Sequence, residues 1–365
     1  MQPPLPSLPW PAGVRSRQLQ GVNGLEMHLA EAGDPNHPCV LLLHGFPDLA
    51  WGWRRVLAPL AAAGYHVLAP DLRGYGRTTG WQASYRADLR PFSWLNLVKD
   101  LVALLDVLRI EHVHGLVGHD FGSPLAAYAA LLRSDLFPRV VLMSAPFAGA
   151  PALGLRDHRL DAKLAGLDPP RKHYQHYYAS EAANADLMSA PGGLPAFLRS
   201  YYHMKSADWP GNTPRALPDW RAESLAALPE YYIMRRDQTM PDAVAGAQPG
   251  EASNWLSSSE LEVYVGEFAR TGFQGGLNWY RSNGDPTFQG ELAVLAGRCL
   301  TQPCWFVSGS SDWGNHQSPG ALARMQEHVC EDFRGITLIN GAGHWVQQEQ
   351  PEAVVTALRE AFAED

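Results

Sequence analysis

Short apolar runs recur along the chain and alternate with helical segments. The runs that predict strands are Cys39–Leu43, His66–Ala69, His112–Val117, Val140–Met143, Trp305–Val307 and Ile336–Ile339, since short apolar runs bounded by turn residues are typical of buried strands. The segments that predict helices are Trp53–Ala62, Trp94–Leu108, Ser123–Leu132 and Pro351–Ala363. Because this alternation is typical of parallel sheets with both faces buried, we expect an α/β fold with a mostly parallel central sheet and helices on both faces.

The alternation stops after Pro146, and strand-like runs return only at Trp305. The stretch between them is rich in Tyr, Trp, Pro, Gly and Ala, with short helix-like segments such as Pro195–Met204 and Ser258–Thr271. We interpret it as a helical cap inserted over the carboxyl ends of the strands, where open α/β sheets bind ligands. The expected organisation is an extended proline-rich arm at 1–18, a first core segment at 19–146, the cap domain at 147–285 and a second core segment at 286–365.

The composition narrows the class of protein. The chain has 365 residues and a net charge of −8, which argues against a nucleic-acid partner. Its four cysteines show neither metal-ligand spacing nor a disulfide framework, so a reducing compartment fits best. The N-terminus lacks the features of a signal peptide, and no apolar run approaches the ~18 residues of a membrane helix. We therefore expect a cytoplasmic protein without a membrane span.

The most informative segment is Gly118-His119-Asp120-Phe121-Gly122, between a predicted strand and a predicted helix. A strand, a sharp turn flanked by small residues and a helix form a nucleophile elbow, in which the strained turn and close packing require small neighbours. The usual elbow residue is serine, whereas this chain has aspartate. A simple turn with a helix-capping aspartate is an equally good interpretation of this segment alone.

An aspartate at the elbow changes the bonds that can be cleaved. Serine attacking a saturated carbon leaves an ether, which water does not cleave readily. A carboxylate leaves an ester, which is hydrolysed at its own carbonyl. Asp120 therefore predicts hydrolysis of carbon–heteroatom bonds at saturated carbon, with epoxides and alkyl halides as the obvious substrates.

Three further features complete a candidate site. Phe46 lies in a His-Gly-Phe-Pro string after an apolar strand, and its backbone N–H can pair with that of Phe121 as an oxyanion hole; a plain turn is the alternative. His344 lies on a Gly-flanked loop after the last strand, in the chain order of a nucleophile–acid–histidine site. Asp312 follows another strand and can orient His344, with helix capping as its alternative role. His119, beside the nucleophile, is expected to serve in packing or hydrogen bonding.

From about Leu19 to the C-terminus, these motifs resemble the epoxide hydrolases of the α/β-hydrolase fold. The most specific match is the segment 271–281, TGFQGGLNWYR, and the resemblance implies that its Tyr280 donates a hydrogen bond to the epoxide oxygen. A second tyrosine is implied at the front of the cap, in a Tyr-Gln context. Tyr174 matches this position, and Tyr177 and Tyr178 lie close to it as alternatives.

The resemblance implies a small epoxide substrate and catalysis without a metal or an organic cofactor. The aromatic content of the cap predicts an apolar pocket. Its expected wall consists of Phe46, Phe121, Trp51, Gln175 and Trp345, with core packing as the alternative role of the aromatic members. A monomer and a homodimer both stay open.

Two other functions compete with this interpretation. Haloalkane dehalogenases also use an aspartate elbow, but they commonly hold the halide with indole or amide N–H donors, often from a Trp after the nucleophile. This chain has Phe121 at that position, and a pair of phenols suits an alkoxide leaving group better than a halide. A non-catalytic ligand-binding relative is the second alternative, since a fold alone does not establish activity.

Overall fold

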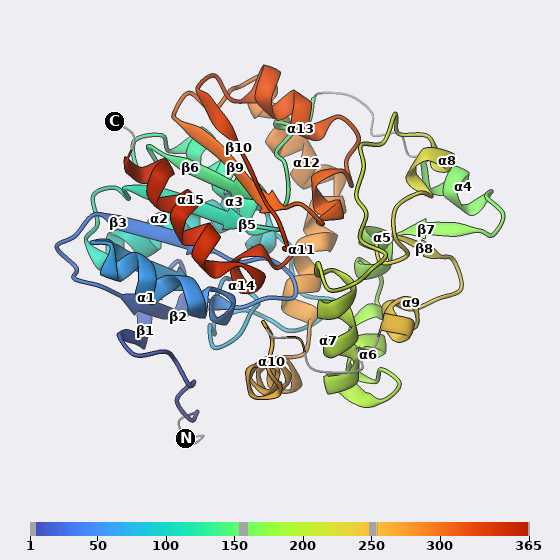
Figure 1. Ribbon diagram of the computed structural model, residues 1–365, viewed down its shortest axis with the longest axis horizontal. Helices are drawn as coiled ribbons and strands as arrows, with labels where there is room; N and C mark the ends of the chain where they lie inside the picture. Colours follow the sequence, from blue (N-terminus) through green and yellow to red (C-terminus); the bar gives the residue numbers. More distant parts are fainter. Residues whose placement is uncertain (1–4, 153–159, 248–252, 254, 364–365) are drawn as a thin grey trace.

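Figure 1 shows the computed structural model of the chain, which describes residues 5–152, 160–247, 253 and 255–363. Within these residues, an eight-stranded sheet has the order β1-β2-β4-β3-β5-β6-β9-β10. Its strands are β1 (Val14–Val22), β2 (Leu25–Ala32), β3 (Cys39–Leu43), β4 (His66–Pro70), β5 (Gly115–His119), β6 (Val140–Met143), β9 (Cys304–Gly309) and β10 (Phe333–Ile339). All pairs from β4 to β10 are parallel, which confirms the expected α/β fold.

The sequence does not predict the hairpin at one edge of this sheet. β1 pairs antiparallel with β2, and β2 antiparallel with β4. β1 is mainly polar and exposed, with only Leu19 and Val22 buried, so it lacks the apolar run of an inner strand. β1 also begins at Val14, inside the range 1–18 that we expected to be an extended arm, of which residues 1–4 lie outside the described part of the chain.

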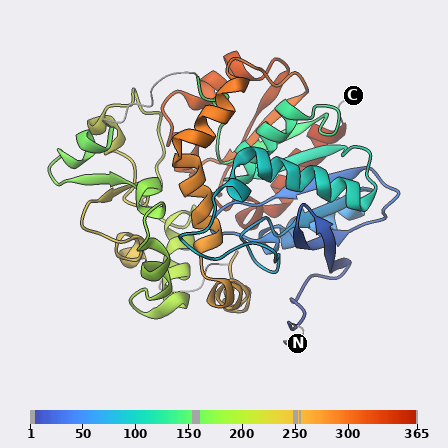
Figure 2. The same ribbon diagram turned by 180° about the vertical axis from the view of Figure 1, so that it is seen from behind.

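Helices cover both faces of the sheet. In β3, Leu41 and Leu43 belong to the apolar cluster that contains residues of α2 and α3, whereas Val40 and Leu42 belong to the cluster that contains residues of α1 and α15. Figure 1 shows α1 and α15 on the near face, and Figure 2 shows α2 and α3 on the opposite face. These helices are α1 (Arg54–Ala62), α2 (Trp94–Leu108), α3 (Gly122–Leu132) and α15 (Pro351–Ala363). Burial of both faces explains why β3 and β6 are apolar throughout.

The strand that precedes Asp120 departs from its predicted bounds. β5 spans Gly115–His119 rather than His112–Val117. Gly118 and His119 interrupt the apolar pattern, yet both are buried in the strand. The strand therefore runs directly into Asp120.

The remaining elements lie mainly between β6 and β9. They are α4 (Leu160–Ala165), β7 (Arg171–His173), α5 (Tyr174–Tyr178), α6 (Ala183–Met188), α7 (Gly193–Met204), α8 (Ala222–Leu225), β8 (Ile233–Arg235), α9 (Met240–Val244), α10 (Ser258–Thr271), α11 (Gln274–Gly284) and α12 (Pro286–Leu292), followed after β9 by α13 (Ala321–Arg324) and α14 (Val346–Glu349). β7 and β8 form a short antiparallel pair. In both views α5, α6, α7 and α9 lie together beside the sheet, with α11 between them and the sheet. No helix in the described ranges is long and apolar enough to cross a membrane.

Candidate active site

Asp120 lies in the turn between β5 and α3 with a φ angle of +53°. A non-glycine residue in this left-handed region is strained and is held there by its surroundings. A Cβ atom at Gly118 would collide with the carbonyl of Gly122, and one at Gly122 would collide with the carbonyl of Leu43. A Cβ atom at Gly45 would collide with the side chain of Asp120 itself. The glycines around the turn are therefore a steric requirement of the elbow.

The two oxygens of the Asp120 carboxylate have different neighbours. Oδ1 accepts a hydrogen bond of 2.8 Å from the backbone N–H of Phe46, and Oδ2 lies 3.4 Å from Nε2 of His344. Burial raises the pKa of Asp120, but His344 and the ammonium of Lys205 outweigh burial and hold this pKa well below its ordinary value. The carboxylate is therefore ionised at neutral pH, with Oδ1 engaged and Oδ2 facing the histidine.

His344 lies between Asp120 and a second carboxylate. Its Nδ1 is 3.2 Å from both carboxylate oxygens of Asp312, which also accept hydrogen bonds from Gly314 N–H at 2.7 Å and Ser308 Oγ at 3.3 Å. Burial and Lys205 lower the pKa of His344, but the two carboxylates outweigh them and raise it above its ordinary value. The structure thus brings together the three residues that the motifs predicted as nucleophile, base and orienting acid.

The loop that carries His344 is held by Glu349 at the end of α14. Oε2 of Glu349 accepts hydrogen bonds from the backbone N–H groups of Gly343 at 2.9 Å and Ala207 at 2.8 Å, and Oε1 accepts from Trp345 N–H at 2.9 Å. Burial raises the pKa of Glu349 to about 7. The carboxyl group of Glu349 therefore ties both neighbours of His344 to each other and to the segment after α7.

His119 has the hydrogen-bonding role expected of it. Its Nε2 donates to the carbonyl of His344 at 2.7 Å, and its Nδ1 accepts from Nε2 of Gln347 at 3.3 Å. Burial lowers the pKa of His119 to about 3, so the ring is neutral. These bonds link the strand before the nucleophile to the loop of the histidine.

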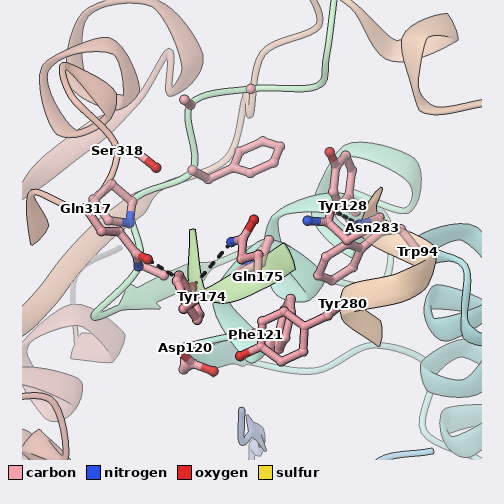
Figure 3. Close-up of a pocket in the computed structure, with 16 residues that line it drawn as sticks. Trp94, Asp120, Phe121, Tyr128, Tyr174, Gln175, Tyr280, Asn283, Gln317 and Ser318 are labelled. Atoms are coloured by element: carbon pink, nitrogen blue, oxygen red, sulfur yellow. Dashed lines mark hydrogen bonds between the residues drawn. The ribbon is translucent and has the colours of Figure 1, made fainter. Parts of the chain in front are cut away.

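A cavity of about 200 Å³ opens above Asp120. Its lining residues are Trp94, Asp120, Phe121, Pro124, Tyr128, Ala145, Pro146, Phe147, Ala148, Gly149, Tyr174, Gln175, Tyr280, Asn283, Gln317 and Ser318. In Figure 3 the Tyr280 hydroxyl points toward Asp120, and Gln175 and Gln317 flank Tyr174. The cavity therefore has the carboxylate on the sheet side and two phenols on the cap side.

The two phenols differ in their hydrogen bonds. The Tyr174 hydroxyl donates to Oε1 of Gln317 at 3.1 Å and accepts from Nε2 of Gln175 at 3.3 Å. The Tyr280 hydroxyl has no hydrogen-bond partner among the described residues. Burial, together with the nearby negative charge of Asp120, raises the pKa of both tyrosines. Both are therefore protonated at neutral pH and can donate to an oxygen in the cavity.

The alternative cap tyrosines do not line this cavity. The Tyr177 hydroxyl donates to Oδ2 of Asp186 at 3.1 Å. Tyr178 is fully buried, with its ring 4.9 Å from that of Tyr280 and 5.0 Å from that of Phe46. Of the three candidates on α5, only Tyr174 faces the space above Asp120.

Three residues expected on the pocket wall lie elsewhere. Phe121 and Gln175 line the cavity, but Phe46, Trp51 and Trp345 do not. Phe46 reaches the site through its backbone N–H, while its side chain packs among aromatic rings behind the wall. A sequence pattern shows that an aromatic residue is near a motif but not which way its ring points.

The two tryptophans have clear packing partners. The Trp51 ring lies 5.0 Å from that of Trp10 in the N-terminal segment and under the guanidinium of Arg54 at 5.2 Å. Trp345 is fully buried, and its Nε1 donates to the carbonyl of Tyr202 at 2.9 Å. Both rings therefore serve in packing, the alternative role that the sequence left open.

Sequence reasoning missed several residues around the site. Gln317 and Asn283 line the cavity, Glu349 holds the histidine loop, and Lys205 contributes a buried charge. None of them belongs to a motif, and each acts through a contact between segments far apart in the chain. Asn283, Gln317 and Glu349 each follow a predicted site residue closely enough to have been candidates, whereas Lys205 does not.

Comparisons with known proteins agree with this geometry. The sequence family described as the alpha/beta hydrolase fold matches residues 38–167. Epoxide hydrolase A of Mycobacterium tuberculosis is 34% identical over 354 residues, which cover 95% of this chain and 97% of that protein. An epoxide hydrolase of Caballeronia sordidicola is 32% identical and covers 95% of this chain and 93% of its own length. The solved epoxide hydrolase from an endophytic Streptomyces has a TM-score of 0.79 at 30% identity, with 96% of each chain covered.

Proposed function

The chain belongs to the epoxide hydrolases of the α/β-hydrolase fold, hydrolases that act on ether bonds, and we propose that it opens an epoxide through an ester on Asp120. The observation that carries this mechanism is the placement of the Asp120 carboxylate. It lies between the Phe46 N–H and His344, in a cavity with two protonated phenols on its other side. The nucleophile and the proton donors thus line one cavity, and the base His344 lies directly beside the nucleophile.

In the first step, Oδ2 of Asp120 attacks one ring carbon of the epoxide. The carbon–oxygen bond of the ring breaks, and the released oxygen takes a proton from Tyr280 or Tyr174. Oδ2 is the attacking atom because Oδ1 is held by the Phe46 N–H. The product of this step is a hydroxyalkyl ester of Asp120.

In the second step, His344 takes a proton from water, and the water oxygen attacks Cγ of Asp120. Oδ1 becomes the oxyanion and is stabilised by the N–H of Phe46, with that of Phe121 as the second donor, at about 3–4 kcal/mol per donor. The intermediate collapses, His344 returns its proton to the leaving oxygen, and the vicinal diol departs. Asp120 is left with the second proton of the water and releases it to solvent, while the tyrosinate takes up a proton from solvent, so the site is restored.

The cavity favours a small substrate with an apolar group on its epoxide ring. Its volume of about 200 Å³ and its lining by Trp94, Phe121 and Phe147 suit a compact hydrocarbon group on the epoxide. The groups in both steps come from one chain, so catalysis requires no second copy. The cap that supplies the tyrosines is assigned to 147–285, between the core segments 19–146 and 286–365.

A single-turnover reaction in heavy-oxygen water tests the mechanism. With enzyme in excess, the first diol should carry no label, because its new oxygen comes from Asp120, and the label should remain in the peptide that contains Asp120. Label in the first diol would show direct attack by water and overturn the ester mechanism. Asp120→Asn, checked by mass for deamidation, should form neither ester nor diol.

The halide alternative has less support from the cavity. The only tryptophan among its described lining residues is Trp94, whose Nε1 donates to Oδ1 of Asn283 at 3.1 Å. That indole N–H is therefore already engaged, whereas two phenols face the space above the carboxylate. A bromoalkane assayed beside a styrene-type epoxide should be turned over far more slowly.

A further inference from the structure

Lys205 is a buried lysine at the end of α7. Burial lowers the pKa of its ammonium, and the carboxylates of Asp120 and Asp312 oppose that shift and favour the charged form. The Lys205 side chain is 4% exposed, and its Nζ lies over four aromatic rings, at 5.2 Å from Tyr232, 5.4 Å from Tyr201, 5.5 Å from Trp345 and 5.8 Å from Tyr231. Among the described residues, no carboxylate is within ion-pair distance of this ammonium. Aromatic faces attract a cation, but lysine is almost never fully buried without a paired charge. A cation in this setting calls for an explanation beyond packing.

The cage of Lys205 adjoins the loop of the histidine. The carbonyl of Lys205 accepts the backbone N–H of His344 at 2.8 Å, and Trp345, one wall of the cage, follows His344 in the chain. The rings of His344 and Trp345 are 4.8 Å apart. The backbones of Lys205 and His344 are therefore hydrogen-bonded, and the Trp345 ring contacts both the ammonium and the imidazole, although Lys205 does not line the cavity.

The charges around His344 show what this cation does. Asp120 faces Nε2 of the imidazole and Asp312 faces Nδ1, and two carboxylates favour the protonated ring. A protonated imidazole cannot take a proton from water. The charge of Lys205 lowers the pKa of the imidazole and so opposes both carboxylates.

The other titratable groups near this pair are neutral or face away. His119 is neutral, and burial keeps Tyr201, Tyr231 and Tyr232 protonated. Glu349 contacts backbone N–H groups on either side of His344 rather than its ring. The ring therefore responds mainly to Asp120, Asp312 and Lys205.

We propose that Lys205 is a positioning residue that keeps the imidazole of His344 neutral, and thus able to activate water, during hydrolysis of the Asp120 ester. This role rests on the proposed function. Formation of the ester removes the charge of Asp120, so Asp312 and Lys205 then offset each other and the neutral ring is favoured. The cation acts through His344 and touches no reacting atom.

The test compares Lys205→Met, which removes the charge but keeps an apolar stem, with Lys205→Arg, which keeps the charge. Hydrolysis of the preformed ester is followed in single turnovers across pH. In Lys205→Met the midpoint of the acid limb should rise by about one pH unit, which makes hydrolysis about tenfold slower below the midpoint. In Lys205→Arg and in the exposed control Lys99→Met, the midpoint should stay near that of the wild type.

A purely structural lysine would give a different result. A cation at the C-terminal end of α7 also interacts favourably with the helix dipole, so its loss would lower the melting temperature but leave the midpoint in place. An unchanged midpoint in folded Lys205→Met therefore overturns the proposal. If the wild type forms no ester on Asp120, the proposed function itself fails, and the two failures are distinguishable.

A measurement on the unaltered enzyme covers the case in which Lys205→Met does not fold. Lysine labelled with ¹³C at Cε reports the charge of each ammonium by NMR. The resonance of Lys205, assigned with Lys205→Arg, should be that of a charged ammonium throughout the pH range of activity. A neutral amine at pH 7 would overturn the proposal without any further variant.

Discussion

The two sides of the cavity hold their functional groups by different means. On the sheet side, which we call the floor, Asp120, His344 and Asp312 are fixed by a strained turn and by hydrogen bonds to backbone and side chains. On the cap side, the roof, Tyr280 is held by ring contacts alone: 4.5 Å from Phe121, 4.9 Å from Tyr178 and 5.3 Å from Phe46. At Tyr280 the placement of the ring is thus separate from the chemistry of its hydroxyl, whereas the hydroxyl of Tyr174 is hydrogen-bonded to Gln317 and Gln175.

This difference follows from what each side has to do. Attack on carbon requires a carboxylate oxygen in one orientation, and a misplacement of about 1 Å can cost a factor of 100 in rate. A phenol has to stay protonated and reach an oxygen whose position depends on the substrate. Rigid bonding suits the first task, and ring packing with a free hydroxyl suits the second.

The largest loss of rate is expected for a substitution on the floor. His344→Gln removes the base but leaves Asp120 and the roof in place, so the ester should form and then persist, with its hydrolysis slowed by about 10³–10⁴-fold. Intact-protein mass spectrometry should show one substrate added per chain. A variant that turns over without accumulating adduct would show that another group activates water.

A smaller effect is expected on the roof. Tyr280→Phe keeps the ring contacts and removes the proton donor, so ester formation should slow by about 100-fold with little change in thermal stability. Rapid-quench measurement of the ester separates this step from hydrolysis, which should keep its wild-type rate.

Two further variants complete the test of the roof. Tyr174→Phe should slow the same step, although its hydroxyl also loses bonds to Gln317 and Gln175. Tyr178→Phe is the matched control, because its ring packs on Tyr280 but does not line the cavity. Equal losses in Tyr178→Phe and Tyr280→Phe would contradict the assignment of the proton donor.

The residues of the floor were easier to predict from the sequence than those of the roof. Asp120, Asp312 and His344 each follow a strand, and the order of their motifs along the chain points to one edge of a parallel sheet. Parallel strands buried on both faces have a strong apolar signal, so the inner sheet was predictable. The exposed strand β1 has no such signal.

Residues that act through packing could not be predicted from the sequence in this way. Lys205 follows a helix with no motif, and only the folded chain shows that four rings surround its ammonium. Trp51 lies close to a motif, yet its ring turns toward Trp10. The choice of Tyr174 came from resemblance, because spacing alone does not separate it from two neighbours on α5.

A further variant, Glu349→Gln, weakens the hydrogen bonding of the floor without changing its reacting groups. In Glu349→Gln one carboxylate oxygen becomes an amide NH2 group, which donates and cannot accept from the N–H groups bound there. Each unsatisfied N–H costs about 1–3 kcal/mol, so the melting temperature should fall. Ester hydrolysis should slow by about tenfold because the loop of His344 loses its anchor.

Two comparisons show whether Glu349 acts on the floor alone. The concentration dependence of ester formation should be unchanged, since Glu349 does not line the cavity. Glu352→Gln, an exposed change on α15, should alter neither rate nor stability. Equal slowing of ester formation and ester hydrolysis in Glu349→Gln would mean that Glu349 supports the roof as well.

The smallest effect concerns the charge coupling within the floor. The ester removes the charge of Asp120, and Asp120→Asn imitates this in the resting enzyme. Because Asp120 is one of the groups that raise the pKa of His344, the variant should lower that pKa, by about one pH unit for a single close carboxylate. The neutral, water-activating form would then extend to lower pH. Histidine-labelled NMR titration measures this directly, with mass spectrometry to exclude deamidation. An unchanged pKa would mean that Asp120 does not affect the protonation of His344, and that ester formation does not switch the base on.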